Sequence, residues 1–508
     1  MRVLHACAEV YPLLKTGGLA DVTAGLPPAL MALGCDVRLV LPGFPAICAG
    51  VVARRTVASL PGRFGAAAIR VTLGMLPNGV PAYVIEAPEL YDRAGNPYAD
   101  ADGHAYADNH RRFALLGWIA ARLAQGLDPA WTAHLVHAHD WHAGLAPAYL
   151  HADAIAACAA GKPSEPSEPG KPSEPGSKSC QPAASVITVH NLAYQGVFHY
   201  DTFHELGLPD AFFGIDGVEF HGQVSFLKAG LFYANCITTV SPTYAREIQG
   251  PEQGCGLDGL LRTRAADLVG ILNGVDATVW NPATDAAIAA RYGRASLSSK
   301  ALCRAALQAE TGLATQDGAP VFGVVSRLTD QKGLHLVLAG MQAILARGGQ
   351  LVLLGTGDAH LEAAFVALAV ANPASVSIEI GYDEAKAHRI IAGCDVILVP
   401  SRFEPCGLTQ LYALAYGTLP LVRRVGGLAD SVVDATPQNL DDGSATGIVF
   451  DQFTVDAFAE AVRRAFALFD RSDAWRAVQH AAMAQSFGWD AAAVRLLALY
   501  ERIAASPG

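Results

Sequence analysis

The sequence predicts an α/β protein made of two doubly wound, Rossmann-like domains. Short apolar runs typical of buried parallel strands alternate with helical stretches, and this alternation occurs twice, once in each half of the 508-residue chain. A hydrophobic fraction of 52% and a charged fraction of 16% supply enough apolar side chains for two separate cores. We therefore expect two parallel sheets, each covered by helices on both faces.

The first half of the chain carries the less regular of the two series. Its predicted strands are residues 2–7, 37–41, 82–86, 135–138, 186–189 and 237–240. Its predicted helices are residues 22–33, 111–125 and 144–151. Each helix lies between two of the strands, as the crossover connection of a parallel sheet requires.

The second half repeats the alternation more cleanly. Its predicted strands are residues 321–326, 351–354, 376–380, 396–400 and 419–423. Its predicted helices are residues 333–347, 359–370, 384–393 and 409–416, with two further helical stretches at 474–485 and 491–504. The regular spacing predicts a second doubly wound domain.

We expect the first domain to span residues 1–272 and the second residues 273–486, and we expect a final helix within 487–508 to cross back to the first domain. Residues 161–183 begin with a repeat of Pro, Ser, Glu and Lys that cannot bury an apolar face. Because a strand-like run resumes directly after this segment, it is interpreted as an insertion within the first domain and not as a linker between domains.

Composition narrows the class of protein. There are 36 Lys and Arg against 47 Asp and Glu, so the net charge is −11, and this balance argues against nucleic-acid binding and against adhesion to anionic membranes. No apolar run approaches the roughly 18 residues of a membrane span. The ten cysteines are scattered without a Cys-x-x-Cys pair, which is typical of free thiols in a reducing compartment. We expect a cytoplasmic protein whose oligomeric state the sequence leaves open.

In open α/β sheets, ligands bind outside the carboxyl ends of the strands, so residues just after strands are the candidates for chemistry. The first such group runs from Lys15 to Asp21, ahead of a predicted helix. Gly17 and Gly18 let the backbone approach a ligand, and Lys15 adds a charge suited to phosphate. Asp21 is expected either to cap the helix or to accept hydrogen bonds from sugar hydroxyls. An ordinary strand-to-helix turn is the alternative.

A second group, residues 137–142, holds three histidines and an aspartate after a strand. This cluster raises a different class of function, a metal-dependent hydrolase, which would need further ligands and residues that orient them. His190 is available, but no distant set of Asp and His completes such a site. A strand end whose polar side chains line a cleft is the preferred interpretation.

Two more groups supply hydrogen bonds and positive charge. A strand delivers His190, whose imidazole can hydrogen-bond a sugar hydroxyl. Arg327 and Lys332 follow the first strand of the second half, five residues apart across a turn. Together they are suited to grip a diphosphate and to stabilise it as a leaving group. A solvated turn with two surface cations is the alternative.

The last group lies between a predicted strand and a helix that we expect to begin near Cys406. A helix N-terminus presents free N–H groups to an anion, so Cys406, Gly407, Leu408 and Thr409 are candidates for binding phosphate. Glu404, just before them, is placed to hold the hydroxyls of a sugar, although it is equally suited to cap the helix.

Taken together, these motifs resemble the family of bacterial glycogen synthases and plant starch synthases, which has the GT-B fold of two Rossmann-like domains facing each other across a deep cleft. The motifs that carry the resemblance are KTGGLAD at 15–21, HAHDWHAGL at 137–145, TVHNLAYQG at 188–196 and SRFEPCGLTQ at 401–410. Shorter ones are SPTYAREI at 241–248, LNGVD at 272–276, QKG at 331–333 and GTLPLVRRVGGLAD at 417–430. The resemblance covers nearly all of the chain outside the low-complexity segment, where typical bacterial members have a shorter connection.

The resemblance implies transfer of glucose from ADP-glucose to the non-reducing end of an α-1,4-glucan such as glycogen, with retention of configuration. By the same resemblance, Arg327 and Lys332 bind the donor diphosphate and Glu404 lies at the donor sugar. His190 and Asp21 contact the sugar or its surroundings. No metal and no other cofactor is implied, because cationic side chains and helix N-termini stabilise the leaving group.

The remaining implied positions concern the nucleotide and its phosphates. Lys15 and the backbone of Gly17 and Gly18 meet the phosphates from the first domain. Asn273 is a cleft residue, and Tyr382 occupies the position that stacks on adenine. A related GT-B enzyme that uses another nucleotide-sugar donor remains an alternative within the same class, because the residues themselves do not choose between ADP-glucose and UDP-glucose.

Overall fold

The computed structural model describes residues 1–160 and 183–505, so the low-complexity segment lies outside the described residues except for Ala183. The chain divides into two compact units. Unit 1 comprises Met1–Val240, Ala245–Ile271 and Trp489–Gly508, and unit 2 comprises Ser241–Tyr244 and Leu272–Gly488. Helix α8 (Pro242–Glu247) lies where the chain passes from one unit to the other.

Unit 1 is built on a mixed sheet with the strand order β12-β11-β7-β6-β1-β2-β5-β4-β3. The strands are β1 (Arg2–Ala6), β2 (Asp36–Pro42), β3 (Val52–Pro61), β4 (Ala68–Met75), β5 (Pro81–Glu86), β6 (Leu135–His139), β7 (Ala184–Val189), β11 (Cys236–Thr239) and β12 (Leu268–Gly270). A small antiparallel sheet is formed by β8 (Val197–Phe198), β9 (Glu219–Phe220) and β10 (Gln223–Ser225).

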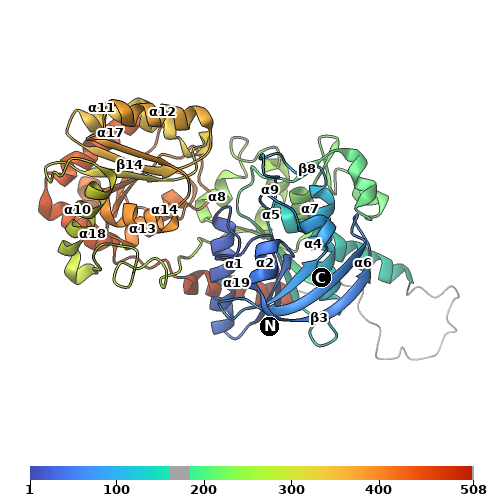
Figure 1. Cartoon of the computed structure of the whole chain (residues 1–508). Helices are drawn as coiled ribbons and strands as arrows, with labels where there is room; N and C mark the ends of the chain where they lie inside the picture. The colour runs from blue at the N-terminus through green and yellow to red at the C-terminus, as the bar shows by residue number, and fades with distance from the viewer. Residues whose placement is uncertain (161–182, 506–508) are drawn as a thin grey trace, which may run out of the picture. The chain divides into compact units, whose positions relative to one another are not determined.

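The helices of unit 1 connect and cover these strands (Figure 1). They are α1 (Gly18–Ala32), α2 (Pro45–Gly50), α3 (Pro88–Tyr91), α4 (Asn109–Ala124), α5 (Asp140–Ala143), α6 (Leu145–Ala160), α7 (Phe226–Tyr233), α9 (Asp258–Thr263) and α19 (Trp489–Ala505). Neighbouring strands run parallel from β12 to β5.

One edge of this sheet corrects the prediction of an entirely parallel sheet. β4 pairs antiparallel with β5, and β3 pairs antiparallel with β4. The search for continuous apolar runs missed both strands because an antiparallel edge needs only one buried face. The exposed residues that begin β3 include Arg54 and Arg55, which a buried parallel strand would not carry.

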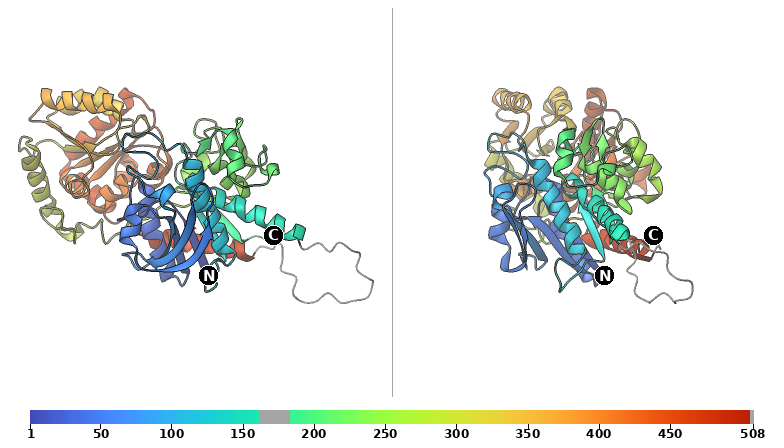
Figure 2. Two further views of the ribbon diagram at one scale, coloured as in Figure 1. Left: turned by 45° about the vertical axis from the view of Figure 1, so that its right-hand side comes forward. Right: turned by 90° about the vertical axis from the view of Figure 1, so that its right-hand side faces the viewer.

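The C-terminal helix belongs to the core of unit 1. α19 packs on α1, and Figure 2 shows its red ribbon beside the blue N-terminal elements. Leu26 and Leu30 of α1 share one buried cluster with Ala493 and Leu496 of α19. The packing is close, because a Cβ atom added at Gly25 would lie 2.1 Å from Nε1 of Trp489. The glycine therefore makes room for the buried indole.

Unit 2 is a doubly wound parallel sheet with the strand order β15-β14-β13-β16-β17-β18. Its strands are β13 (Val321–Val325), β14 (Gln350–Gly355), β15 (Val376–Ile380), β16 (Val396–Val399), β17 (Leu419–Arg423) and β18 (Ile448–Phe450). Its helices are α10 (Lys300–Thr311), α11 (Leu334–Leu345), α12 (Ala359–Ala371), α13 (Glu384–Gly393), α14 (Thr409–Ala415), α15 (Gly426–Ser431), α16 (Pro437–Asp441), α17 (Val455–Phe469) and α18 (Ser472–Ala482).

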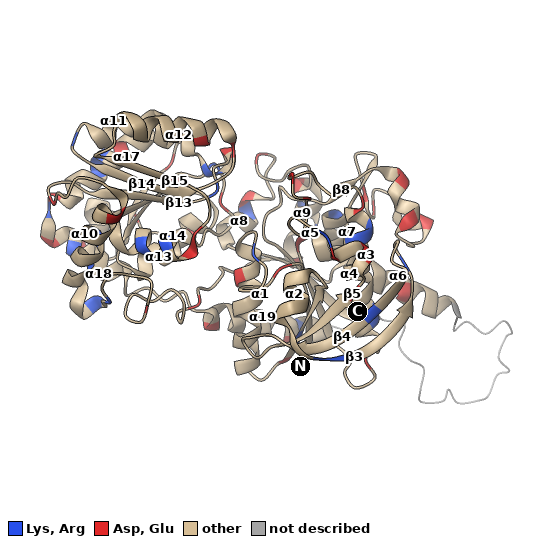
Figure 3. Ribbon diagram, in the orientation of Figure 1, with Lys and Arg blue, Asp and Glu red and all other residues tan. Residues whose placement is uncertain are grey.

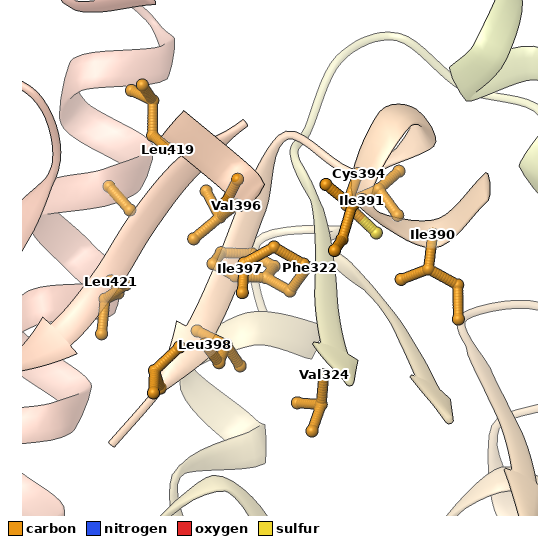
Figure 4. Packing of buried hydrophobic residues seen from close by; sticks show 14 of the residues in the cluster. Phe322, Val324, Ile390, Ile391, Cys394, Val396, Ile397, Leu398, Leu419 and Leu421 are labelled. Carbon is orange, nitrogen blue, oxygen red and sulfur yellow. The ribbon is translucent and has the colours of Figure 1, made fainter. Parts of the chain in front are cut away.

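The core of unit 2 lies between this sheet and its helices. Figure 4 shows Phe322 of β13, Val396 of β16 and Leu419 of β17 on neighbouring strands, with Ile390 of α13 close by, and all four are fully buried. Strands that are buried on both faces have continuous apolar sequences, which explains why the hydrophobic pattern of the second half of the chain is so regular. The packed sheet is a rigid base for the loops that follow its strands.

The contact between α1 and α19 is open to a direct test. We expect Gly25→Leu to lower the thermal midpoint of unfolding, because the new side chain must displace Trp489, and overpacking of this kind costs about 1–3 kcal/mol. Differential scanning fluorimetry would measure it. Gly214→Ala is the matched control, because a Cβ there meets nothing within 4 Å. Equal midpoints for Gly25→Leu and wild type would contradict the packing described.

Candidate active site

The glycine loop of unit 1 lies between β1 and α1. α1 begins at Gly18, four residues before the predicted start, and Gly17 is its N-cap. Asp21 therefore lies inside the helix, and the idea that it caps the helix is wrong. Its Oδ1 is 3.0 Å from Nζ of Lys15, with both side chains 20% exposed. A Cβ at Gly17 would meet nothing within 4 Å, so the backbone there is open to a ligand.

Glu9 holds this loop in place, and the sequence reasoning missed it. Its Oε2 accepts the backbone N–H of Thr16 at 2.5 Å, and its Oε1 accepts the Thr16 hydroxyl at 2.6 Å. The hydroxyl of Tyr98 donates to the same Oε1. Glu9 is only 2% exposed and follows β1 closely in sequence. An acidic residue so soon after a buried strand was the signal that could have revealed it.

A row of polar side chains crosses one face of the unit 1 sheet. His137 of β6 has both ring nitrogens engaged, Nδ1 with the Tyr500 hydroxyl at 2.6 Å and Nε2 with the Thr188 hydroxyl at 2.5 Å. Thr188 in turn shares a hydrogen bond of 2.5 Å with Thr238 on β11. Buried polar groups must be paired in this way, so Tyr500 of α19 supports the row from outside the sheet.

The metal alternative finds its best geometry in His5, His137 and His139, whose candidate ligand atoms lie within 4.8 Å of one another. Two facts argue against it. His139 uses both ring nitrogens, toward His5 at 2.9 Å and toward His190 at 3.0 Å, just as His137 uses both of its own. The rings of His137 and His139 are also stacked, 20° from parallel, so their lone pairs do not converge on one point.

Asp140 turns the chain at the end of β6 and fixes His190. Its φ of 53° lies in the left-handed region, which Asp adopts more readily than most residues. The bent backbone lets Oδ1 accept the N–H of His190 at 2.7 Å. Burial raises the pKa of Asp140 to about 7 and lowers the pKa of His190 to about 3. His190 is therefore neutral near pH 7.

In unit 2, the loops after β13 and β16 meet in a charged contact. Nζ of Lys332 lies 2.6 Å from Oε2 of Glu404, and the Ser401 hydroxyl donates to the same oxygen at 2.8 Å. The Glu404 side chain is 7% exposed and that of Lys332 is 19% exposed. The two residues are 72 apart in sequence. Both were site candidates, and the structure brings them together.

A glycine makes this meeting possible. Gly333 has a φ of 66°, and a Cβ there would lie 2.1 Å from the carbonyl oxygen of Pro400. Only glycine both adopts this backbone conformation freely and allows so close an approach. The N–H of Arg402 then donates to the carbonyl of Gln331 at 2.8 Å, which joins the two loops directly. Lys332 is thereby held against Glu404.

The segment that contains Glu404 is a loop and not the start of a helix. α14 begins at Thr409, which confirms the start of the predicted helix 409–416, whereas the start expected near Cys406 is wrong and Glu404 does not cap the helix. Gly407, with a φ of 69°, turns the chain before the helix. The side chain of Gln410 closes the turn by donating to the carbonyls of Cys406 and Gly407, at 3.0 and 2.8 Å.

The remaining candidates of this segment lie around the same turn. Cys406 is buried, which raises the pKa of its thiol to about 12, and it is hydrogen-bonded to Asn273. Leu408 is the N-cap residue of α14, and the Thr409 hydroxyl donates to the carbonyl of Val325 at 3.4 Å. The structure thus pairs Asn273 with Cys406 and sets Thr409 beside the end of β13.

Two glycines of the GTLPLVRRVGGLAD motif pack under this loop. A Cβ at Gly426 would lie 1.9 Å from the carbonyl oxygen of Glu404, and one at Gly427 would lie 2.1 Å from that of Cys406. The N–H of Gly427 donates to the Glu404 carbonyl at 3.0 Å. The glycine pair therefore lets the chain pack directly against the backbone of Glu404. The motif alone did not reveal this role.

Two candidates lie toward solvent. Arg327 is exposed, beside the short bridge between Leu328 and Gly357. Tyr382 follows β15, is 71% exposed and donates a hydrogen bond to Glu384. Both lie in loops after strands of the unit 2 sheet, where a ligand can reach them.

Charge is mixed over each unit. Figure 3 shows Lys and Arg interspersed with Asp and Glu on the helices and loops of both units. Within the described part of the chain, none of the helices is long and apolar enough to cross a bilayer.

The family described as "Starch synthase catalytic domain" matches residues 2–160 and 171–263, and "Glycosyl transferases group 1" matches residues 309–477. A glycogen synthase of Francisella philomiragia is 55% identical over 505 residues, which cover 99% of this chain and all of the relative. One of Francisella tularensis subsp. novicida is 54% identical over 99% of both chains. The chain belongs to the glycogen and starch synthase family.

Solved structures agree with this assignment. One similar structure is the catalytic domain of starch synthase IV from Arabidopsis thaliana, described as bound to ADP and acarbose. The superposition covers 99% of both chains, with a TM-score of 0.86 and 30% sequence identity. A sucrose-phosphate synthase from Thermosynechococcus elongatus has a TM-score of 0.56 at 16% identity, which shows the fold alone. The predicted GT-B fold is confirmed, and this member of the glycogen and starch synthase family is a glycosyltransferase.

The pKa of Asp140 gives the stability of this synthase a defined pH dependence. Because burial raises the folded pKa to about 7, above the unfolded value, the folded state holds a proton that the unfolded state lacks between the two values. The stability that Asp140 contributes is therefore present at low pH and is lost as the pH rises toward 7. Asp140→Asn removes this titration and still presents an oxygen to the N–H of His190.

We expect the wild type to lose stability relative to Asp140→Asn between about pH 4 and about pH 7, by at most about 4 kcal/mol in all, with little further change at higher pH. Thermal or denaturant unfolding of both proteins across this range would measure the difference. If the difference in unfolding free energy between the two proteins stayed constant over this pH range, or changed in favour of the wild type, Asp140 would not be a buried, protonated carboxyl.

Proposed function

We propose that this glycosyltransferase moves glucose from ADP-glucose to the non-reducing end of an α-1,4-glucan, with retention of configuration. The names of its relatives and the ADP in the starch synthase IV structure support this donor and acceptor. The observation that carries the proposal is the contact between Lys332 and Glu404 at the carboxyl ends of neighbouring parallel strands. It supports the proposal because a cation suited to a leaving diphosphate and a carboxylate suited to sugar hydroxyls then lie side by side.

Positive charge stabilises the leaving group. When the bond between the anomeric carbon and the diphosphate oxygen breaks, negative charge accumulates on the departing ADP. Lys332 and Arg327 lie on one loop and provide two cations for this charge, which favours the transition state over the bound substrate. The acceptor hydroxyl forms the new bond on the face that ADP leaves, and its proton passes to the departing phosphate. This step needs no metal.

Glu404 is placed to hold the donor sugar. Lys332 and Ser401 both contact its Oε2, which leaves Oε1 to accept hydrogen bonds from sugar hydroxyls. A carboxyl fixed by two such contacts loses little further freedom on binding. The Lys332 charge is therefore shared between a structural contact with Glu404 and the diphosphate.

The unit 1 candidates have complementary roles in this proposal. The open backbone at Gly17 and Gly18 binds phosphate through its N–H groups, and Lys15 adds charge. His190 and Asp21 contact the sugar or its immediate surroundings. Because Asp21 already pairs with Lys15, a phosphate would compete with Asp21 for the ammonium group.

The nucleotide is assigned to the unit 2 loops. Exposed Tyr382 stacks on the adenine, because a ring that is 71% exposed has a face available to a base. The backbone at Gly407, Leu408 and Thr409 meets phosphate, and Asn273, held near Cys406, lies beside it. We place the enzyme in the cytoplasm, in line with the free state of every cysteine within the described residues.

The leaving-group assignment predicts a loss in turnover. We expect Lys332→Ala to lower kcat with ADP-glucose about 100-fold or more, because one fixed cation is lost from the transition state. Release of ADP in the presence of glycogen measures it. Arg463→Ala is the control for loss of a positive charge, because Arg463 is an exposed residue of α17 paired with Glu460. Near-normal turnover of Lys332→Ala would show that the assignment is wrong.

The donor can be decided directly. We expect glycogen chains to lengthen with ADP-glucose, with kcat/KM at least about 10-fold higher than with UDP-glucose, a difference of about 1.4 kcal/mol in binding the transition state. Incorporation of labelled glucose into glycogen with each donor at equal concentration is the measurement. Faster incorporation from UDP-glucose would retain the glycosyltransferase and overturn the proposed donor.

A further inference from the structure

Three histidines of unit 1 form a continuous hydrogen-bonded chain. Nδ1 of His5 lies 2.9 Å from Nε2 of His139, and Nδ1 of His139 lies 3.0 Å from Nε2 of His190. His5 and His139 are fully buried, on the neighbouring strands β1 and β6. His190 directly follows β7, is half-buried, and is the member of the chain that a ligand can reach.

All three rings are neutral near pH 7. Burial lowers the pKa of His5 and of His190 to about 3, and it lowers the pKa of His139 well below the usual range. A neutral imidazole has one N–H and one lone pair, and each bond in the chain joins one of each. The tautomers are therefore coupled, and a change in one ring requires a change in the others.

Only two arrangements satisfy both bonds. In the outward arrangement, every ring carries its proton on Nδ1. His5 then donates to His139, His139 donates to His190, and His190 presents its Nδ1–H beyond the chain. In the inward arrangement, every ring carries its proton on Nε2, the bonds run the other way, and His190 presents a lone pair at Nδ1.

The buried end of the chain decides between them. Nε2 of His5 is buried and has no hydrogen-bond partner among the described residues. The nearest polar ring, His137, cannot serve, because Tyr500 and Thr188 occupy its two nitrogens. The inward arrangement would leave an N–H group unpaired in the core, and such groups are rarer in proteins than unpaired acceptors. The outward arrangement leaves only a lone pair there.

We propose that His5 and His139 are positioning residues that hold His190 in its Nδ1–H tautomer, so that this synthase presents a neutral N–H donor to the sugar. The proposal rests on the proposed function in one respect, the contact of His190 with the sugar. A neutral donor can hydrogen-bond an oxygen of the sugar without adding a further charge at the sugar. In a Ser-His-Asp triad, loss of the group that sets the tautomer lowers kcat by about 10⁴-fold, so such control can matter greatly.

The first test is spectroscopic and independent of activity. Nitrogen-15 NMR of protein labelled at histidine distinguishes a protonated from an unprotonated ring nitrogen, and comparison with His190→Gln assigns the signals of His190. We expect a protonated Nδ1 and an unprotonated Nε2 for His190 in the wild type. A protonated Nε2 would overturn the proposal. This measurement needs no variant of the two buried histidines.

The second test separates positioning from stability. We expect His139→Leu to lower kcat about 10-fold or more with a change in donor KM of less than about 3-fold, because the ring of His190 is then free to take either tautomer. His139→Gln should restore most of kcat, since its amide can both accept from His5 and donate to His190. Thr238→Val is the matched control, because it removes a buried hydroxyl further along the same row while Thr188 still occupies Nε2 of His137. It should lower the thermal midpoint and leave kcat unchanged.

The outcomes are distinguishable. If His190→Ala lowers kcat but His139→Leu does not, the positioning role of His139 is overturned. If His190→Ala is equally active, the contact of His190 with the sugar is wrong, and the failure belongs to the proposed function. If His139→Leu does not fold, His5→Asn is tested in its place. The asparagine keeps a side-chain N–H near Nε2 of His139. This variant should therefore retain both kcat and the Nδ1–H signal of His190. Loss of that signal in an active His5→Asn protein would overturn the proposal.

Discussion

The contact between Lys332 and Glu404 is the constraint on which the unit 2 site depends. The order β13 beside β16 brings two loops to one edge of the sheet although their residues are 72 apart in sequence. Gly333 then lets the first loop lie against Pro400, and Gly426 lets another strand end approach Glu404 from beneath. A Cβ at either glycine would clash with the backbone of the loop that carries Glu404. The parallel sheet, the close backbone contacts and the ion pair therefore form one structural unit.

The histidines and hydroxyls beneath the unit 1 site bury polar groups without adding charge to the core. Isolated charges are costly in a core, so burial lowers the pKa of His137 and His139 well below the usual range and raises the pKa of Asp140. Each neutral ring must then be hydrogen-bonded. His5, His139 and His190 meet this need with one another, and His137 meets it in the row with Thr188 and Thr238. α19 completes the row through Tyr500, so the last helix of the chain contributes to the order of the site as well as to the core.

The sequence predicted the regular parts of the fold well and the contacts between loops poorly. α13 and β17 match their predicted bounds, because buried strands and the helices between them have strong apolar patterns. The same search missed β3, whose exposed face breaks the pattern, and it also left α10, α17 and β18 unassigned. The motifs identified Lys332, Glu404 and His190 as candidates.

The motifs did not show what holds the candidates, since the partners are remote in sequence. Tyr98 is 89 residues from Glu9, and Tyr500 is 363 residues from His137. Positive charge at a leaving group is useful only where it is fixed, and neutral donors at a sugar are useful only where the tautomer is fixed. In our two proposals, an ion pair between loops fixes the first and hydrogen bonds between buried rings fix the second. On this basis, residues that never touch a substrate set the chemistry of those that do.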